Sequence, residues 1–100
     1  MKKESLEGEL LKDSHIFLQP ERYRIMELLA EKPMYISELS RALPEERRLI
    51  AYHLAALEEC GFVKSRYEIS ERPRSRGKAI RVYTATDKAA EVKAKLKKGL

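Results

Sequence analysis

The second half of the chain joins a helical pattern to two alternating patterns with almost no sequence between them. In residues 36–61 the apolar side chains recur at helical spacing, with a break at Pro44. Residues 62–69 and 80–84 then alternate between apolar and polar side chains, as strands with one buried face do. Between the two lies a basic loop, residues 70–79, punctuated by proline and glycine. Two helices that lead directly into a basic hairpin constrain the fold more than any other feature.

Two further helices are expected upstream. Leucines fall on one side of a helix over residues 4–14. Pro20 suits the first position of the next helix, because its missing N–H is not needed there. That helix extends to about Glu31, and Pro33 ends it. Residues 34–36 are expected to be short and extended.

Local signals mark the ends of the remaining helices. Ser37 is expected to cap a short helix, since its hydroxyl can accept a backbone hydrogen bond. Pro44 ends that helix and is expected to open the next one, residues 45–60. Gly61 is placed to adopt the left-handed conformation that ends a helix. Thr86 can cap the last helix.

The predicted order is α-α-(β)-α-α-β-β-α, a mainly α chain with a small β-hairpin, which is a winged helix-turn-helix. One hundred residues suit a single domain, residues 1–100. We expect a winged-helix core over 18–86, preceded by an N-terminal helix in 1–17 and followed by a C-terminal helix in 87–100. A chain this short buries only about two-thirds of its unfolded surface, so a second copy would add useful burial.

Charge is distributed unevenly along the chain. The net charge is +5, but residues 1–60 carry nine Lys/Arg against twelve Asp/Glu, whereas residues 61–100 carry twelve against four. Four of those cations are lysines near the C-terminus, which could form a solvated tail. Without them, residues 64–81 still hold seven cations against two acids. A cationic region of this kind favours an anionic partner, of which nucleic acid is the commonest.

Composition also restricts the cellular setting. No apolar run reaches the roughly 18 residues that span a bilayer, and the N-terminus lacks a signal-like apolar stretch. Cys60 is the one cysteine, so no intrachain disulfide can form. We expect a cytoplasmic protein without membrane partners. Asparagine is absent, glutamine occurs once, and 37% of residues are charged, which suits a thermophile.

The predicted helix 45–60 has a polar face opposite its apolar stripe. Side chains in the first half of such a helix can reach base edges in the major groove of DNA. Arginine can donate to guanine O6 and N7, and glutamate can accept from cytosine N4. The candidate residues are Glu45, Arg47, Arg48 and Tyr52. The alternative is an amphipathic helix whose polar face is only solvated.

The basic loop supplies the second group of candidate DNA contacts. Arginine gains from the concentrated negative potential of a narrow minor groove or of phosphates. Three arginines and a lysine alternate with Pro73, Ser75 and Gly77: Arg72, Arg74, Arg76 and Lys78. Arg66 and Arg81, at the base of the hairpin, are candidate phosphate contacts or surface charges. A disordered solubilising loop is the alternative.

Three segments carry a resemblance to a known family. They read Leu-x-Pro-x-Arg-x-x-Ile-x-x-Leu-Leu over 18–29, Ile-Ser-Glu-Leu over 36–39, and Tyr-His-Leu-x-x-Leu-x-x-x-Gly-Phe-Val over 52–63. With the hairpin end, residues 76–84, the chain resembles the ArsR-type winged-helix repressors and related archaeal regulators over 18–86. The resemblance implies a homodimeric transcriptional regulator that places one recognition helix and one wing per subunit on double-stranded operator DNA.

The metal sites of that family are missing from this sequence. Metal-sensing members carry a Cys-x-Cys pair on the helix before the recognition helix, but residues 37–42 contain no thiol. Others use Asp and His on the last helix, and residues 87–98 contain no His. We therefore expect no metal and no cofactor. The sequence identifies no small-molecule effector.

The terminal helices are expected to form the dimer interface. Their apolar residues exceed what a minimal winged helix needs, and in the resembling family such helices pair across a two-fold axis. The candidate interface residues are Leu6, Leu10, Phe17, Ala89, Val92 and Leu96. The alternative is that these side chains only cover their own core.

Two further side chains are expected to be structural. His53 lies at the edge of the apolar stripe of helix 45–60, where it suits packing or hydrogen bonding better than ligand binding. Cys60, at the end of that helix, is expected to be a buried, inert thiol.

The sequence thus predicts a sequence-specific DNA-binding transcriptional regulator. The alternative is a winged helix that serves as a protein-interaction module, which the acids Glu45 and Glu46 favour. No glycine-rich phosphate loop, nucleophile with a base or metal-ligand cluster supports an enzyme.

Overall fold

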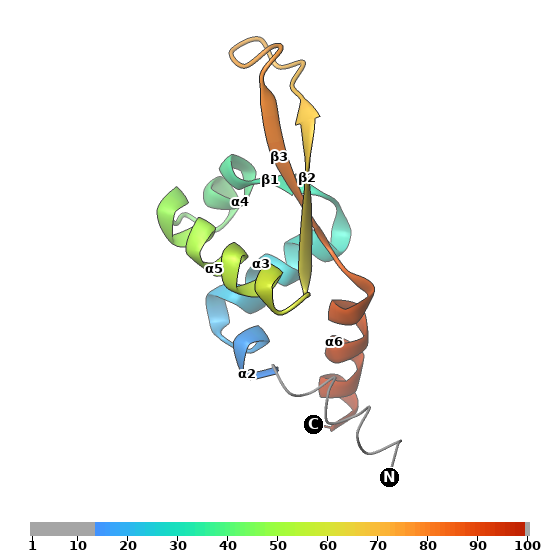
Figure 1. The fold of residues 1–100 in the computed structure, drawn as a ribbon. Helices are drawn as coiled ribbons and strands as arrows, with labels where there is room; N and C mark the ends of the chain where they lie inside the picture. Colours follow the sequence, from blue (N-terminus) through green and yellow to red (C-terminus); the bar gives the residue numbers. More distant parts are fainter. Residues whose placement is uncertain (1–13, 100) are drawn as a thin grey trace.

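The computed structural model describes residues 14–99 and shows helices packed at the base of a long hairpin (Figure 1). The elements are α2 (Ser14–Phe17), α3 (Pro20–Glu31), β1 (Met34–Tyr35), α4 (Ile36–Ala42), α5 (Arg47–Glu59), β2 (Val63–Ile69), β3 (Ala79–Ala85) and α6 (Asp87–Gly99). From α3 onward this is the predicted winged helix-turn-helix order. The predicted helix 4–14, with Leu6 and Leu10, lies outside the described residues except for Ser14.

The three strands form one antiparallel sheet in the order β1-β3-β2. In the hairpin, Val63 pairs with Ala85 at the base and Ile69 with Ala79 at the far end. The short strand β1 joins the other edge of β3, where Met34 pairs with Tyr83. The extended segment predicted after α3 is thus a third strand. It connects the hairpin to the start of α4.

The core lies between the base of the sheet and the surrounding helices. Its largest fully buried side chains come from helices, strands and the turns between them: Phe17, Phe62, Ile25, Leu39, Ile50, Leu54, Leu57, Val63 and Val92. The Phe17 and Phe62 rings meet edge to face, with centroids 5.1 Å apart. The apolar stripe predicted on helix 45–60 is therefore confirmed as the core face of α5.

The start of α4 differs from the sequence prediction. The helix begins at Ile36, and Tyr35 rather than Ser37 is the N-cap residue. Glu38 reaches back and its Oε1 accepts a hydrogen bond from the Tyr35 N–H at 2.9 Å. A carboxylate at this position satisfies a backbone donor at the helix start, as in a capping box. The assignment of Ser37 as the cap was wrong because Glu38 fixes the helix two residues earlier.

The start of α5 also lies later than predicted. The helix begins at Arg47, with Glu46 as the N-cap residue, so Pro44 does not open it. The Ser40 hydroxyl donates to the Glu45 carbonyl, and the Glu45 N–H donates to the Ser40 carbonyl. These bonds hold residue 45 in the turn between α4 and α5, outside the helix.

Two predicted helix ends are confirmed. Gly61 has φ +83° and follows α5, where a left-handed residue lets the chain turn into β2. Thr86 precedes α6, and its hydroxyl accepts a hydrogen bond from the Ala89 N–H at 3.3 Å. The same hydroxyl donates to the Gly61 carbonyl at 2.6 Å. The end of α5 and the start of α6 are thereby joined.

Candidate nucleic-acid interface

The polar face of α5 is exposed to solvent in this chain. Ile50, Leu54 and Leu57 are buried, whereas Arg48 is exposed and Tyr52 is 64% exposed. Arg47 and Arg48 occupy the first turn of the helix. The backbone N–H groups of a first turn carry positive partial charge, which adds to that of the two arginines. The first half of α5 therefore presents cationic and aromatic side chains to solvent.

A buried pair lies beneath this face. The Arg22 Nε donates to His53 Nδ1 at 2.9 Å, and both side chains are buried. The guanidinium carbon of Arg22 also lies 5.7 Å from the centre of the Tyr52 ring. This confirms His53 as a hydrogen-bonding residue. Burial first, and then the Arg22 charge, lower the pKa of His53, which keeps the ring neutral and able to accept.

Sequence reasoning placed Arg22 in the family-like segment 18–29 but gave it no role. The signal that could have found it is position, because Arg22 falls on the same face of α3 as Ile25, Met26 and Leu29. A charge on an apolar stripe indicates a buried partner. Arg22 and His53 together fix the orientation of α5 on α3.

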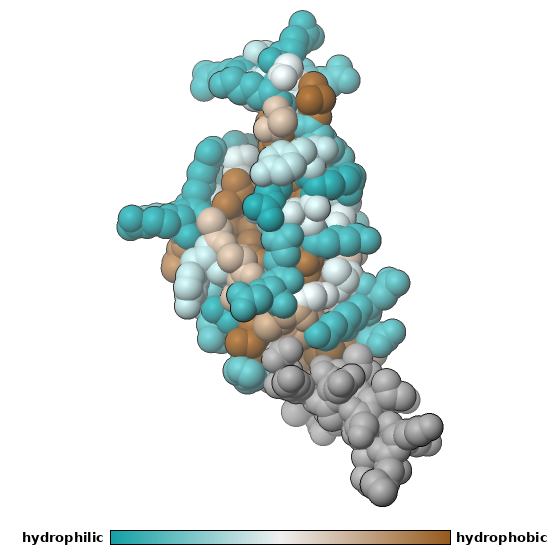
Figure 2. All heavy atoms as spheres, in the orientation of Figure 1, coloured by the Kyte–Doolittle hydropathy of each residue, from teal (hydrophilic) through white to brown (hydrophobic). Residues whose placement is uncertain are grey.

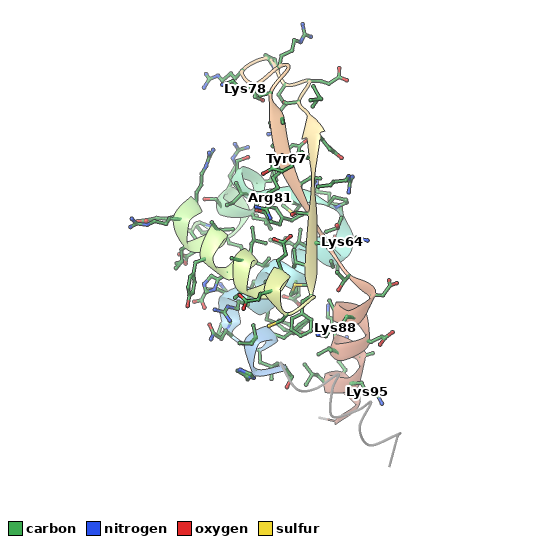
Figure 3. All side chains as sticks on the ribbon, in the orientation of Figure 1. Lys64, Tyr67, Lys78, Arg81, Lys88 and Lys95 are labelled. Atoms are coloured by element: carbon green, nitrogen blue, oxygen red, sulfur yellow. The ribbon has the colours of Figure 1, made fainter. Side chains whose placement is uncertain are left out.

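The wing, residues 70–79, is a loop at the far end of the hairpin that hydrogen bonds close on itself (Figures 1 and 3). Ser70 is 2% exposed and its hydroxyl is 2.7 Å from that of Ser75. At the neck of the loop the Ser70 N–H donates to the Lys78 carbonyl, and the Gly77 N–H donates to the Ser70 carbonyl, both at 2.9 Å. Gly77 has φ +82°, which requires the freedom of glycine.

The basic side chains of the wing lie on the outside of this framework. Arg72, Arg74, Arg76 and Lys78 are all exposed, and Figure 2 shows hydrophilic side chains gathered over the tip of the hairpin. Arg72 differs from the others because it also contacts the helix-turn-helix. It pairs with Glu38 of α4, with 3.2 Å between Nη2 and Oε2. Among the described residues, the other wing cations have no such ion pair.

The strand register places Arg66 and Arg81 midway along the hairpin, so the prediction that they lie at its base was wrong. Each of the two arginines pairs with a carboxylate. Arg66 contacts Glu68 of the same strand at 2.7 Å. Arg81 contacts Glu58 of α5 at 2.8 Å, and its Nε donates to the Ser65 hydroxyl at 2.8 Å. Figure 3 shows Arg81 where the hairpin passes the helices. The Arg81 contacts join the hairpin to α5, and both ion pairs compete with any contact to phosphate.

A cationic cleft separates the wing from the helix-turn-helix. Its volume is about 700 Å³. Its walls come from β1, α4, the start of α5, the wing and β3. The arginines that line it are Arg41, Arg47, Arg72 and Arg74. Sequence reasoning missed Arg41, because only the folded chain brings α4 opposite the wing.

The candidate dimer residues are divided between core and surface. Phe17, Ala89 and Val92 are buried in the core of a single chain, and Leu96 is partly buried. Leu96 and Leu18, which is 48% exposed, line a groove of about 400 Å³ between the start of α3 and the end of α6. Leu6 and Leu10 lie outside the described residues. Among residues 14–97, the apolar surface in this groove includes Leu18 and Leu96.

Three further features of the described residues concern metal ligands, membrane-spanning helices and the cysteine. Residues 14–97 hold no cluster of three side chains able to ligate a metal ion. None of the described helices is both long and apolar enough to cross a membrane. Cys60 is partly buried at the end of α5.

Comparison with known proteins agrees with this geometry. The family model described as bacterial regulatory protein, arsR family, matches residues 19–65, which run from the start of α3 into β2. Residues 19–65 therefore carry a helix-turn-helix of the ArsR type. Comparison with curated protein sequences gives no match.

Solved structures extend the likeness beyond the matched segment. The transcriptional regulator homologue from Pyrococcus horikoshii is 28% identical, with a TM-score of 0.68 over 94% of this chain and 88% of that chain. HlyU from Vibrio cholerae is 23% identical, with a TM-score of 0.66 over 94% and 92%. The transcriptional repressor BigR from Xylella fastidiosa is 23% identical, with a TM-score of 0.65 over 93% and 85%. The described part of the chain therefore has the fold of these regulators.

Proposed function

We propose that this protein is a transcriptional regulator that binds double-stranded DNA in a sequence-specific manner. The observation that carries the proposal is the cationic cleft, because arginines from α4, α5 and the wing line one surface. The ArsR-type match and the regulator named for Pyrococcus horikoshii support it. In this proposal α5 enters the major groove, and the wing lies on the adjoining minor groove or its phosphates.

Base reading falls to the first half of α5. Arg48 and Tyr52 are exposed on the face opposite the core. An arginine that donates two hydrogen bonds to one guanine contributes about 1–3 kcal/mol of discrimination. Arg47 flanks this face and Glu45 lies in the preceding turn, where an acid could accept from cytosine N4. We assign sequence preference mainly to Arg48 and Tyr52.

Affinity falls mainly to the wing. Arg74, Arg76 and Lys78 extend from an ordered loop, so few backbone degrees of freedom are lost when they meet phosphate. Each phosphate contact releases counterions and adds about 0.9 to the slope of log affinity against log salt. The proposed interface is therefore strongly salt-dependent.

The regulator is proposed to act as a homodimer. The groove between α3 and α6, with Leu18 and Leu96 in its lining, is the apolar surface that supports this. A two-fold axis would place two α5 helices about 34 Å apart, in successive major grooves. Leu18→Glu is expected to shift sedimentation toward the monomer, because it places a charge in the proposed apolar interface. Leu18 is exposed in the single chain, so the substitution leaves the core intact.

One observation favours a second function, a protein-interaction module. Tyr67 is 68% exposed and Ile69 is 67% exposed, on the same face of β2. Exposed aromatic and aliphatic side chains are common at protein interfaces. Duplex binding that is absent at low salt, together with copurification of a fixed partner, would favour this function over the first.

Selection of bound sequences from random duplex DNA tests the main proposal. We expect enrichment of a palindrome whose half-sites lie one helical turn apart. A mixture without enriched bases would contradict sequence-specific binding.

A further inference from the structure

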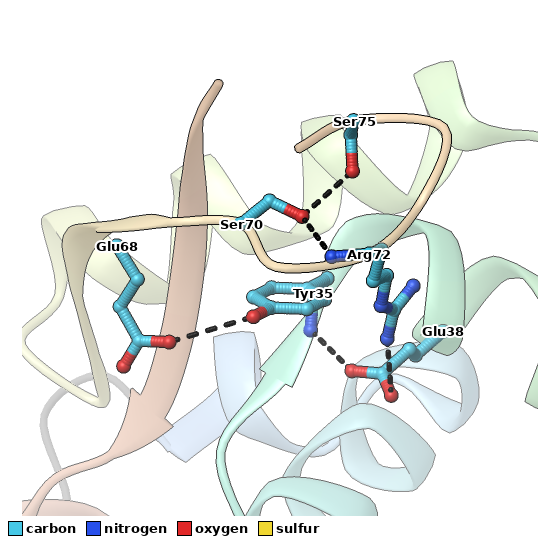
Figure 4. A network of polar contacts seen from close by, with 6 residues as sticks. All are labelled: Tyr35, Glu38, Glu68, Ser70, Arg72 and Ser75. Carbon is cyan, nitrogen blue, oxygen red and sulfur yellow. Dashed lines mark hydrogen bonds and ion pairs between the residues drawn. The ribbon is translucent and has the colours of Figure 1, made fainter. Parts of the chain in front are cut away.

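The wing is fastened to the helix-turn-helix by a contact that lies outside the hairpin itself. Arg72 Nη2 of the wing is 3.2 Å from Glu38 Oε2 of α4. The other oxygen of the same carboxylate, Oε1, accepts the hydrogen bond from the Tyr35 N–H. Glu38 therefore holds the start of α4 with one oxygen and the wing with the other (Figure 4).

Arg72 is held on two further sides. Its guanidinium carbon lies 4.7 Å from the centre of the Tyr35 ring, within the range of a cation–π contact. Its backbone N–H donates to the buried Ser70 hydroxyl at 3.2 Å, and its carbonyl accepts from the Ser75 N–H at 3.1 Å. Figure 4 shows Arg72 between the serines of the wing and Glu38 of α4.

The Tyr35 side chain contacts β2, the strand that leads into the wing. Its hydroxyl lies 3.4 Å from Glu68 Oε1 of β2, at the limit of hydrogen bonding. Tyr35 belongs to β1, which pairs with β3. The wing thus meets the helix-turn-helix through an ion pair, a ring contact and a sheet pairing within one small region.

We propose that Arg72 is a positioning residue, which through Glu38 and Tyr35 fixes the wing at the spacing from α4 and α5 that a DNA backbone requires. This rests on the proposed DNA binding. The phosphate contacts across the cleft then fall to Arg41, Arg47 and Arg74, which line the same space. A wing that is already placed loses less conformational freedom on binding, so the contact adds affinity without touching DNA.

The rival interpretation makes the opposite prediction. If Arg72 instead contacts a phosphate directly, Glu38 competes with that phosphate for the Arg72 guanidinium and also repels the DNA backbone. Removing the Glu38 charge would then free Arg72 and raise affinity. In the positioning account the same change releases the wing and lowers affinity, even though it removes a negative charge from a cationic cleft. The direction of the effect distinguishes the two accounts.

The experiment compares Glu38→Gln with Glu71→Gln in the full chain. The amide oxygen that Glu38→Gln introduces can still accept from the Tyr35 N–H, so the cap of α4 is kept while the charge is lost. Glu71 is an exposed acid of the same wing and makes no hydrogen bond or ion pair with another described residue. Its variant removes the same charge without releasing the wing. The probe is a duplex selected from random sequence, titrated by fluorescence anisotropy over a range of salt.

We expect Glu38→Gln to weaken duplex binding about two- to fivefold, the size that partly exposed ion pairs allow. Glu71→Gln is expected to leave affinity unchanged or raise it. The salt slope of Glu38→Gln should stay within about 0.5 of the wild type, whereas a lost phosphate contact lowers the slope by about 0.9. An affinity for Glu38→Gln that is unchanged or increased, as for Glu71→Gln, overturns the positioning role.

A double-mutant cycle separates positioning from loss of folding. Arg72→Gln changes an exposed loop residue, so we expect this variant to fold like the wild type. If the two residues act as a pair, Glu38→Gln combined with Arg72→Gln binds no more weakly than the worse single variant. Additive losses overturn the pairing. Thermal unfolding of each variant verifies that the chain is folded at the temperature of the titration.

Failure of the proposed function has a different signature. If the wild type binds no duplex at low salt, DNA binding itself is wrong. If the wild type binds and Glu38→Gln behaves like Glu71→Gln, DNA binding stands and only the positioning role is lost.

Discussion

Arg22 Nε donates to His53 Nδ1 at 2.9 Å, which joins α3 to the middle of α5 beneath its exposed face. Arg22 is only 4% exposed and His53 only 6%. The three ion pairs found among the described residues do not include Arg22. The buried guanidinium is instead supported by a neutral imidazole and the Tyr52 ring. Tyr52, which we assign to base reading, therefore rests on a buried polar pair.

This pair predicts a pH dependence of stability. Burial and the Arg22 charge lower the pKa of His53 below its ordinary 6.5, and Glu21 and Glu45 oppose that shift more weakly. Below pH 6.5 the unfolded chain binds a proton that the folded chain resists. The contribution of His53 is therefore complete above pH 6.5 and is lost as the pH falls toward the folded pKa.

His53→Asn is the matched control, because the amide can accept from Arg22 but does not titrate. We expect the free energy of unfolding to fall more steeply below pH 6.5 in the wild type than in His53→Asn. Urea denaturation at a series of pH values measures the difference. Parallel profiles for the two proteins would show that protonation of His53 is not coupled to folding.

Arg22→Leu is expected to lower the free energy of unfolding by about 1–3 kcal/mol. The substitution leaves the Nδ1 atom of His53 as a buried acceptor without its donor, and such an atom costs its full desolvation. Arg24→Leu changes an exposed arginine of the same helix and is expected to alter stability by no more than about 0.5 kcal/mol. Denaturant titration of both variants makes the comparison. Equal effects would mean that the buried hydrogen bond contributes little.

Gly61→Ala is expected to destabilise the protein by about 1–2 kcal/mol, because a residue with a Cβ is strained in the left-handed conformation. Gly61 has φ +83°, and the nearest side-chain atoms to an added Cβ are those of Lys88 at 3.6 and 3.7 Å. Those distances are ordinary contacts, so the cost comes from the backbone. Thermal unfolding measures it. A wild-type melting temperature for Gly61→Ala would argue that the helix end can adopt another conformation.

Arg48→Ala is expected to relax sequence preference at one base position of each half-site. The loss should be about 1–3 kcal/mol of discrimination there, with the other positions unchanged. Lys78→Ala, which removes a cation from the wing, should instead weaken binding to all sequences alike. Repeating the random-duplex selection with both variants tests the assignment. If Arg48→Ala selects the wild-type sequence with the same stringency, Arg48 does not read bases.

Much of the fold could be predicted because its signals are local. The apolar stripe of Ile50, Leu54 and Leu57, the left-handed Gly61 and the Thr86 cap each depend on residues within a few positions of one another. The start of α4 was misplaced because two local signals compete. Ser37 can cap a helix with its hydroxyl, whereas Glu38 can accept from the backbone N–H three residues earlier, and the structure uses Glu38 with Tyr35 as the N-cap residue.

The site was less predictable because its contacts join distant segments. Arg72 and Glu38 come from the wing and α4, and Arg81 and Glu58 are separated by 23 positions. The sequence predicts a hairpin that carries several arginines. It does not show which of these arginines forms an ion pair with a carboxylate. The registers of β1 and β2 on β3 determine which arginine lies beside which carboxylate. Arg41 is the reverse case, an ordinary surface residue in sequence that the fold brings into the cleft.

The salt dependence of duplex binding by Arg74→Ala plus Arg76→Ala tests the central claim most directly. The control, Lys32→Ala plus Lys64→Ala, removes the same charge from exposed positions outside the wing, the cleft and the groove between α3 and α6. If the wing grips the DNA backbone, the wing variant loses affinity and its log–log salt slope falls by about 1.8, while the control keeps the wild-type slope. Affinity and slope that are unchanged in the wing variant, or that fall equally in both, would contradict a wing that contacts DNA.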